Sequence, residues 1–294
     1  MKILPDFRKK EVLRLLEEAP DVSISRPKKE LSWGIAVPDD ENQVMYVWID
    51  ALTNYITVLG YPENEIDDYW PAEAQFVGKD ILRFHALIWP AILLGLGLPL
   101  PKVIHSHGHV LADGHKMSKT IGNVVDPMEA VEKYGLAAFR YYFLRHIDTF
   151  ADSDFTWEKF EKAYNNELAN DLGNLVQRLA AMARKNGLSG RRVKVEFDAE
   201  YRKMMDEMNF VRGFDVVWRK VQDLNKEIDD QKPWELAKNG EVEKVKEVLG
   251  EIIDGLLVVS YHLRPFLPET AEKIEAIFTA EKIEPPKTPL FPKN

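Results

Sequence analysis

The chain has 294 residues, of which 45% are hydrophobic and 30% are charged, a balance typical of a folded globular protein. It contains no cysteine, which excludes disulfides and thiolate zinc sites, and its net charge of −9 argues against indiscriminate binding of polyanions. The longest apolar stretch, residues 81–100, is interrupted by Arg83, His85, Pro90 and Pro99, and the N-terminal residues lack a signal-peptide core. We therefore expect a cytoplasmic protein without a membrane segment.

In the first half of the chain, short apolar runs alternate with helical patterns. Residues 43–49, 74–77 and 102–106 read as strands. Apolar residues recur at helical spacing through residues 80–96, which predicts a buried helix. This alternation predicts an α/β fold in which helices cover a parallel sheet.

From residue 157 onward nearly every segment reads as an amphipathic helix. The first covers residues 157–185, where apolar residues three and four apart line one face and Gly187 serves as a C-terminal cap. Further helices are expected over residues 199–229, 241–263 and 268–280. The predicted fold class is thus α/β followed by all-α, with a helical bundle after the sheet.

A lysine loop, Lys116-Met117-Ser118-Lys119-Thr120, follows the third expected strand and lies between Gly114 and Gly122. Two lysines in such a loop can close over a triphosphate and neutralise the charge that develops on it. Alone, the loop is equally consistent with a solvated surface turn. Its place after a strand favours a phosphate site, because parallel sheets bind ligands at the carboxyl ends of their strands.

Four histidines, His105, His107, His109 and His115, precede or border this loop, and their spacing also suggests a metal site. A strand would place the first three on one face. Because no cysteine ligand accompanies them, we favour the end of an adenosine-binding strand and expect no metal.

Three further segments carry a family resemblance. They are Ile-Ser-Arg at residues 24–26, Tyr-Val-Trp-Ile-Asp-Ala at 46–51, and Phe-Val-Gly-Lys-Asp-Ile-Leu-Arg-Phe-His at 76–85, followed by Trp-Pro. Together with the lysine loop they resemble, in the same order, the methionyl-tRNA synthetases among the class I aminoacyl-tRNA synthetases. The similarity covers residues 20–160 most clearly and continues more weakly to the end.

The resemblance implies a domain plan. Residues 1–125 would form the C-terminal half of a Rossmann-like catalytic domain that bears the lysine loop. Residues 126–155 would form a linker and stem-contact region, and residues 156–294 a helical anticodon-binding domain.

The resemblance also implies roles for single residues. The catalytic residues would be Lys116, Ser118 and Lys119. The ATP-binding residues would be Gly78, Asp80, His107, Gly108, Val110 and Met117. The methionine-binding residues would be Arg26, Trp48, Ala51, Tyr55, Ile81, His85 and Trp89. The residue pattern alone favours plain core for the tryptophans, Ile81 and His85, so their binding role depends on the family.

In the helical part, Trp234 resembles the tryptophan that stacks on the anticodon, and aromatic stacking is a general way to hold an unpaired base. Asn174 and Arg178 lie one helical turn apart at positions where the family reads the anticodon. An ordinary polar helix surface explains these two residues equally well.

The function implied is that of a methionine–tRNA ligase, which activates methionine with ATP and Mg²⁺ and transfers it to tRNA(Met). The family's first signature, a His-x-Gly-His turn, has no counterpart far upstream, since Ser106-His107-Gly108-His109 begins with serine and lies ten residues before the lysine loop. The first half of the catalytic domain and the zinc-bearing insertion are also unmatched, so we expect no bound zinc. We expect a subunit or C-terminal part that is inactive without a partner chain carrying the N-terminal half.

Two alternatives remain. The first is a non-catalytic module that binds the tRNA anticodon. The second is a synthetase for leucine, valine or cysteine, which the aromatic set Trp48, Tyr55 and Trp89 argues against.

Overall fold

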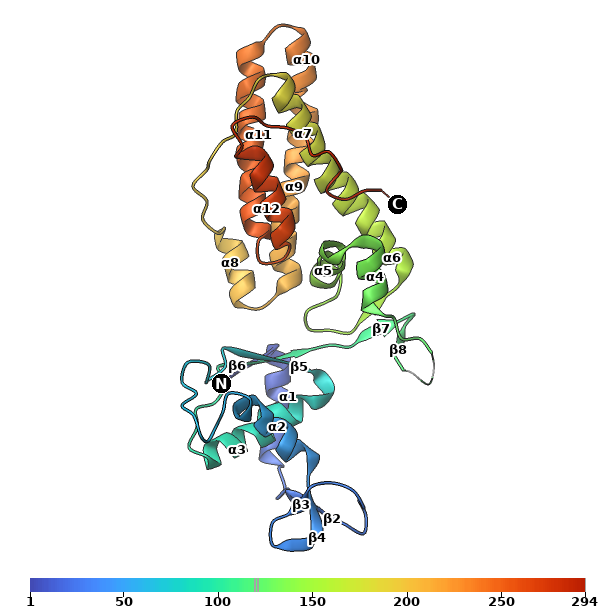
Figure 1. Ribbon diagram of the computed structural model, residues 1–294, viewed down its shortest axis with the longest axis vertical. Helices are drawn as coiled ribbons and strands as arrows, with labels where there is room; N and C mark the ends of the chain where they lie inside the picture. The colour runs from blue at the N-terminus through green and yellow to red at the C-terminus, as the bar shows by residue number, and fades with distance from the viewer. Residues whose placement is uncertain (119, 121, 294) are drawn as a thin grey trace. The chain divides into compact units, whose positions relative to one another are not determined.

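The computed structural model describes residues 1–118, 120 and 122–293. Packing divides the chain into two compact units, Met1–His109 and Val110–Asn294 (Figure 1). The lysine loop thus belongs to the second unit, and the functional division expected at residues 125 and 155 stays a prediction. In the part of the chain that the structure describes, no helix is both long and apolar enough to cross a membrane.

The first unit is built on a parallel sheet with the strand order β1-β6-β5. Strand β5 pairs with β6 along its whole length, from Ala74 opposite Val103 to Gly78 opposite His107. The expected parallel sheet covered by helices is therefore confirmed. The elements are β1 (Lys2–Leu4), α1 (Asp6–Glu17), β2 (Ser25–Pro27), β3 (Ala36–Val37), β4 (Asp40–Met45), α2 (Val47–Thr57), β5 (Ala74–Gly78), η1 (Lys79–Ile81), η2 (Phe84–Ile88), α3 (Trp89–Gly95) and β6 (Val103–His107).

Two apolar cores hold this unit together. One gathers the sheet, α1 and the turn after β5, and its members are Ile3, Val12, Val77, Leu82, Ala86 and Ile104. The other lies between α2 and the η2–α3 segment, and its members are Leu52, Ile56, Ile66, Trp70, Phe84, Trp89 and Leu93. The segment that follows β5 contributes to both cores, so the position of its side chains is fixed from two sides.

The strand expected over residues 43–49 is wrong in its second half. Strand β4 ends at Met45 in a small antiparallel sheet of order β2-β4-β3, and α2 begins at Val47. Leu52 and Ile56, four residues apart on α2, are each only 1% exposed. Burial of this helical face outweighs the β propensity of the apolar run before it.

The helix expected over residues 80–96 is confirmed in outline. It consists of three parts with different winding: the 3₁₀ turn η1, the π-helical turn η2 and the α-helix α3. Single π turns inside helices are rare, and those that occur are often found at functional sites.

The second unit begins with a small sheet of order β8-β7-β9 and continues as a helical bundle. The long helices α9 and α11 pack against each other, and α12 packs on α11 (Figure 1). The elements are β7 (Val110–Ala112), β8 (His115–Lys116), α4 (Pro127–Tyr134), α5 (Leu136–Arg145), β9 (Ser153–Phe155), α6 (Trp157–Ala163), η3 (Tyr164–Gly173), α7 (Asn174–Lys185), α8 (Ala199–Asp206), α9 (Phe210–Gln231), α10 (Pro233–Lys238), α11 (Val242–Leu263) and α12 (Pro268–Phe278).

The helix expected over residues 157–185 is confirmed, but its middle is a π-helix, η3. The apolar face that the sequence indicates is buried, with Leu168, Leu172, Leu175 and Leu179 at 0% exposure. The chain turns after α7 at Gly187, whose φ of 68° is one that glycine adopts readily.

The helix expected over residues 199–229 is interrupted. Helix α8 ends at Asp206, Met208 has a φ of 54°, and Asn209 starts α9 by accepting the N–H of Arg212 at 3.3 Å. An asparagine cap explains the new start, because its side chain satisfies an N–H that the first turn leaves free. The two later helices, α11 and α12, match the expected ranges closely.

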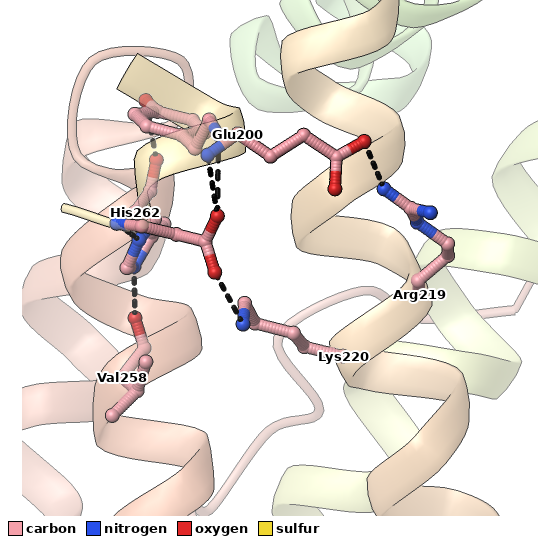
Figure 2. Close-up of polar contacts among 7 residues, drawn as sticks. Glu200, Arg219, Lys220, Val258 and His262 are labelled. Carbon is pink, nitrogen blue, oxygen red and sulfur yellow. Dashed lines mark hydrogen bonds and ion pairs between the residues drawn. The ribbon is translucent and has the colours of Figure 1, made fainter. Parts of the chain in front are cut away.

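A buried histidine fastens the start of α8 to α11 (Figure 2). His262 accepts the N–H of Asp198 on Nε2 at 2.9 Å and donates from Nδ1 to the Val258 carbonyl at 2.8 Å. The Asp198 carboxylate caps α8 and accepts from Lys220 on α9 at 3.3 Å. Both ring nitrogens of His262 are therefore used in the neutral form, and burial lowers the pKa of this imidazole.

Candidate functional site

An aromatic cluster lies between α2 and the η2–α3 segment, and its members are Trp48, Tyr55, Phe84, His85 and Trp89. Trp48 and Phe84 stack with ring centroids 3.9 Å apart and planes 8° from parallel. Tyr55 lies edge-on to His85 at 5.7 Å and 5.9 Å from the ring of Trp89. Four of these residues are ones that the sequence predicts for methionine, and the structure brings them together.

His85 is held in one tautomer. Its Nδ1 donates to the Ile81 carbonyl at 3.1 Å, one helical turn back, so Nε2 accepts from the Tyr55 hydroxyl at 3.0 Å. His85 is 2% exposed, and burial lowers the pKa of its imidazole while the bond to Ile81 opposes that change. Burial also raises the pKa of the Tyr55 phenol. Both side chains are thus uncharged near neutral pH.

Trp89 forms the floor of the cluster and is 0% exposed. Trp70 packs edge-on against it at 5.7 Å and donates its indole N–H to the Pro99 carbonyl at 2.8 Å. The Trp89 indole N–H is buried and has no hydrogen-bond acceptor among the described residues. Aromatic rings such as these make favourable contacts with sulfur atoms and with other aromatic groups.

The turn after β5 presents the residues that are predicted to contact the adenylate. A Cβ added at Gly78 would lie 2.7 Å from the Asp80 carboxylate, so glycine lets this carboxylate fold back over the strand end. Asp80 is exposed and Ile81 is half-buried between the two apolar cores. This turn lies at the carboxyl end of a parallel strand, where α/β sheets bind ligands.

Two of the residues predicted to bind methionine, Arg26 and Ala51, have less specific surroundings. Arg26 stacks over the ring of Tyr46 at 3.9 Å and donates to the carbonyls of Ser23 and Ser25 at 2.9 and 2.8 Å. Tyr46 packs against the same core as the aromatic cluster. Ala51 is exposed on α2, at helical spacing from Trp48 before it and Tyr55 after it.

The predicted adenine-binding turn follows β6. His107 is exposed and donates from Nδ1 to the Gly108 carbonyl at 2.8 Å, while Gly108 is buried. Val110 opens β7 in the second unit, opposite Ser153 of β9. Within residues 1–118, 120 and 122–293, no group of three or more His, Cys, Asp or Glu side chains is arranged to hold a metal ion.

The lysine loop follows a short hairpin formed by β7 and β8. The turn residues of this hairpin, Asp113 and Gly114, both have positive φ values, 51° and 76°. The Asp154 carboxylate accepts the N–H of Gly114 at 2.6 Å, and this bond lowers the pKa of Asp154. Lys116 is exposed at the end of β8, and Met117 and Ser118 are half-buried. Lys119 lies outside the described residues.

Asn123 joins the two ends of the loop, and sequence reasoning missed it. Its carbonyl oxygen accepts the N–H of Ser118 at 2.8 Å, and its amide donates to the Lys116 carbonyl at 3.3 Å. The Gly122 N–H also donates to the Ser118 carbonyl at 3.0 Å. A Gly-Asn pair just after the loop was the available signal, because both residues favour turns.

In the bundle, Arg178 and Trp234 meet although 56 positions separate them in the sequence. The Arg178 guanidinium lies 5.9 Å from the centre of the Trp234 ring and pairs with Asp229 at 3.1 Å. Trp234 is 37% exposed, and Asn174 is exposed one turn before Arg178 on α7. A cavity of about 380 Å³ adjoins Trp234, with lining residues Met182, Lys185, Asn186, Pro233, Ala237 and Lys238.

Comparison with known proteins identifies relatives for this arrangement. Residues 4–180 match the family described as tRNA synthetases class I (M). The methionine–tRNA ligase of Thermotoga maritima is 39% identical over 287 residues, which cover 92% of this chain and 45% of that protein. The methionine–tRNA ligase of Clostridium acetobutylicum is 42% identical, with 95% of this chain and 46% of that protein covered. The chain therefore spans less than half the length of these relatives.

Solved structures agree with these matches. Mycobacterium tuberculosis methionyl-tRNA synthetase in complex with methionyl-adenylate superposes with a TM-score of 0.87 at 32% identity. The match covers 99% of this chain and 64% of the solved one. The ligand-free form of that enzyme gives a TM-score of 0.84 at 31% identity.

Proposed function

This chain belongs to the methionyl-tRNA synthetases, a class I family, and on that basis we propose that it carries part of the active site of a methionine–tRNA ligase. The observation that carries the proposal is the aromatic cluster in which His85 and Tyr55 are locked together in uncharged form. The methionine thioether is polarizable and uncharged. It therefore makes favourable contacts with the aromatic rings and needs no charged partner in the cluster. The cluster offers it Trp48, Tyr55 and Trp89, with Ala51 and Ile81 beside them.

The proposed reaction has two steps. The methionine carboxylate attacks the α-phosphate of ATP, the bond to the β-phosphate breaks, and pyrophosphate leaves with Mg²⁺. A hydroxyl of the terminal adenosine of tRNA(Met) then attacks the methionyl carbonyl and releases AMP. Because the reaction consumes tRNA and ATP, we also infer a cytoplasmic location.

The chain's own residues act by position and charge. Lys116 and Lys119, with Ser118, would stabilise the charge that develops on the leaving pyrophosphate. Met117, the turn at His107 and Gly108, and Val110 would hold the nucleotide. Gly78 and Asp80 would contact the ribose and the adenylate, and Arg26 would contribute charge near the methionine. A partner segment carrying the N-terminal half of the catalytic domain would complete the ATP site.

Methionine-dependent exchange of pyrophosphate into ATP tests this proposal. The chain is co-produced with the upstream part of the Thermotoga maritima relative, the part that precedes its match to this chain. We expect exchange only with that part present, with a response to methionine and none to leucine, valine or cysteine.

Lys116→Ala should lower the exchange about 10²- to 10³-fold, as loss of one charge-stabilising group typically does, and leave methionine affinity unchanged. Lys244→Ala, an exposed lysine on α11, is the matched control. Undiminished exchange by Lys116→Ala would refute the assigned role.

The second candidate is a non-catalytic module that binds the tRNA anticodon, and the contact of Arg178 with Trp234 favours it. A half-exposed tryptophan beside a guanidinium is a suitable platform for an unpaired base. We expect Trp234→Ala to weaken binding of a tRNA(Met) anticodon stem-loop about 5- to 150-fold. Stem-loop binding together with no exchange under any condition would favour the module over the ligase.

A further inference from the structure

The hairpin before the lysine loop is joined to the helical bundle along one edge. Strand β7 pairs in parallel with β9, with Leu111 opposite Asp154 and Ala112 opposite Phe155. Phe155 is 2% exposed and belongs to the core of the bundle. Strand β8 lies at the other end of the order β8-β7-β9 and pairs with β7 alone among the described residues. The bundle core therefore fixes β7, and β8 depends on β7 for its position.

Strand β8 is short, so its pairing alone holds the hairpin weakly. It consists of only His115 and Lys116. The turn itself needs no outside support, because Asp113 and Gly114 already have the positive φ values of a tight two-residue turn. A two-residue ladder, however, resists little movement of the hairpin as a whole, and isolated hairpins are marginally stable. A bond to the turn from outside the hairpin would restrain that movement.

The Asp154 carboxylate supplies this restraint. One oxygen accepts the Gly114 N–H at 2.6 Å, and the other accepts from the Lys159 ammonium at 3.2 Å. Lys159 lies in the first turn of α6, so the carboxylate is bonded to the hairpin on one side and to the bundle on the other. The bond from Gly114, and after it the bond from Lys159, lowers the pKa of Asp154. This carboxylate is therefore ionised near neutral pH.

The position of Gly114 bears directly on that of Lys116. One residue separates the two, and two residues span at most about 7 Å, so a shift of the turn carries the lysine with it. At the far end of the loop, the Asn123 side chain bonds to the loop backbone. The lysine loop is thus tied on both sides, by Asp154 before it and by Asn123 after it.

We propose that Asp154 is a positioning residue for the lysine loop, which holds Gly114 and so fixes the direction in which Lys116 reaches the leaving pyrophosphate. The inference rests on the proposed function, which assigns Lys116 to that charge. Asp154 acts through the main chain of the hairpin and needs no contact with ATP or methionine. Its loss should therefore slow the chemical step and leave the binding of methionine unchanged.

Methionine-dependent pyrophosphate exchange by the co-produced pair tests the proposal with two substitutions at one position. Asp154→Ala removes the acceptor and should lower kcat about five- to tenfold at an unchanged KM for methionine, because the lost acceptor is charged but partly open to solvent. Asp154→Asn keeps an oxygen for the Gly114 N–H and loses only the charge. It should stay within about threefold of the unaltered pair.

A double substitution separates positioning from general damage. If Asp154 acts through Lys116, Asp154→Ala should cost about twofold or less in a chain that already carries Lys116→Ala. If Asp154 merely stabilises the fold, the two losses should multiply, and the KM for methionine should rise as well.

Asp148→Ala is the matched control. The Asp148 carboxylate also accepts main-chain N–H groups, those of Phe150 and Ala151, but in the loop that precedes β9. This substitution should leave kcat and KM unchanged. Normal kcat in Asp154→Ala, equal losses in Asp154→Asn and Asp154→Ala, multiplied losses in the double variant, or an equal loss in Asp148→Ala would each overturn the inference.

Amide hydrogen exchange of the chain alone reports on the restraint without any ligase activity. The Gly114 amide should exchange about five- to tenfold faster in Asp154→Ala and close to its original rate in Asp154→Asn. An unchanged rate in Asp154→Ala would contradict the inference.

The two proposals can be told apart by their failures. Pyrophosphate exchange that is insensitive to Asp154→Ala would contradict the positioning role and leave the ligase standing. No pyrophosphate exchange by the unaltered pair would contradict the ligase, and it would overturn the positioning role together with the role of Lys116.

Discussion

The aromatic cluster and the lysine loop are held in place by different forces. In the cluster, packing sets the positions of the side chains. Trp48 stacks on Phe84, and Trp89 is 0% exposed. In the loop, Lys116 is exposed and the backbone is tied by the two bonds of Asn123. An apolar ligand side chain is recognised by shape, which has to exist beforehand. A triphosphate is recognised by charge, which acts over longer distances and tolerates a lightly held backbone.

Trp89→Ala should break the cluster and have the largest effect. Replacing a fully buried tryptophan leaves a cavity, which typically costs about 3–5 kcal/mol of unfolding free energy. Urea unfolding of the chain, with hydrogen exchange to assign the loss to α2 and α3, measures it. Trp234→Ala at 37% exposure is the comparison and should change stability far less. Equal losses would mean that packing does not set the cluster apart.

Asn123→Ala should loosen the loop and leave the bundle intact. Two hydrogen bonds are lost, each with a net worth of about 0.5–1.5 kcal/mol, so the exchange activity of the assembled protein should fall about tenfold. The thermal midpoint should hardly change. Asn239→Ala, which removes an exposed amide that bonds to Glu241, is the control. An unaffected exchange rate would show that the loop needs no tie.

Tyr55→Phe sharpens the comparison within the cluster, because it removes one bond and keeps the ring. Nε2 of His85 then has no donor, and a lost bond of this kind is worth about 1 kcal/mol. We expect a weaker methionine affinity, read from the methionine dependence of exchange, and little change in the affinity for ATP. Tyr69→Phe, at 75% exposure, should have no such effect.

The pH dependence of stability should give the smallest effect. Burial lowers the pKa of His85 in the folded chain, so its stabilising contribution is complete above the unfolded value near 6.5. Below that value the unfolded chain binds a proton that the folded chain does not, and the unfolding free energy falls until the folded pKa is reached. His262 titrates in the same direction. Urea unfolding of His85→Gln and His262→Gln between about pH 7 and pH 5 should show a shallower slope in each, whereas an unchanged slope would contradict the burial argument.

The sequence predicted the parts of the molecule that follow from local periodicity and from motifs. The parallel sheet, the buried face of residues 157–185 and the gathering of Trp48, Tyr55, His85 and Trp89 are of this kind. It misassigned residues 46–49, because an apolar β-branched run reads as a strand unless the helical spacing of Leu52 and Ile56 after it is weighed.

Two residues of the candidate site lacked a sufficient local signal. Phe84 belongs to the site only because it stacks on Trp48, 36 positions earlier in the sequence, and in isolation it reads as core. Asn123 acquires its role from the way the chain returns on itself after the lysine loop. A long-range stack sets the role of Phe84 and the conformation of the loop sets that of Asn123, and periodicity reports neither.

The π-helix η3 sets the direction in which Arg178 points from α7, the helix that follows it directly. Phe160, Tyr164, Leu168 and Leu172 are each four residues apart and all buried, whereas three steps of four would drift about 120° around a regular α-helix. The wider winding of η3 reduces this drift. Removing one residue from η3 would turn α7 about its axis and carry Arg178 away from Trp234. The number of residues in η3 thus fixes the rotation of α7 about its axis. Insertions and deletions in η3 should therefore be far less tolerated than substitutions.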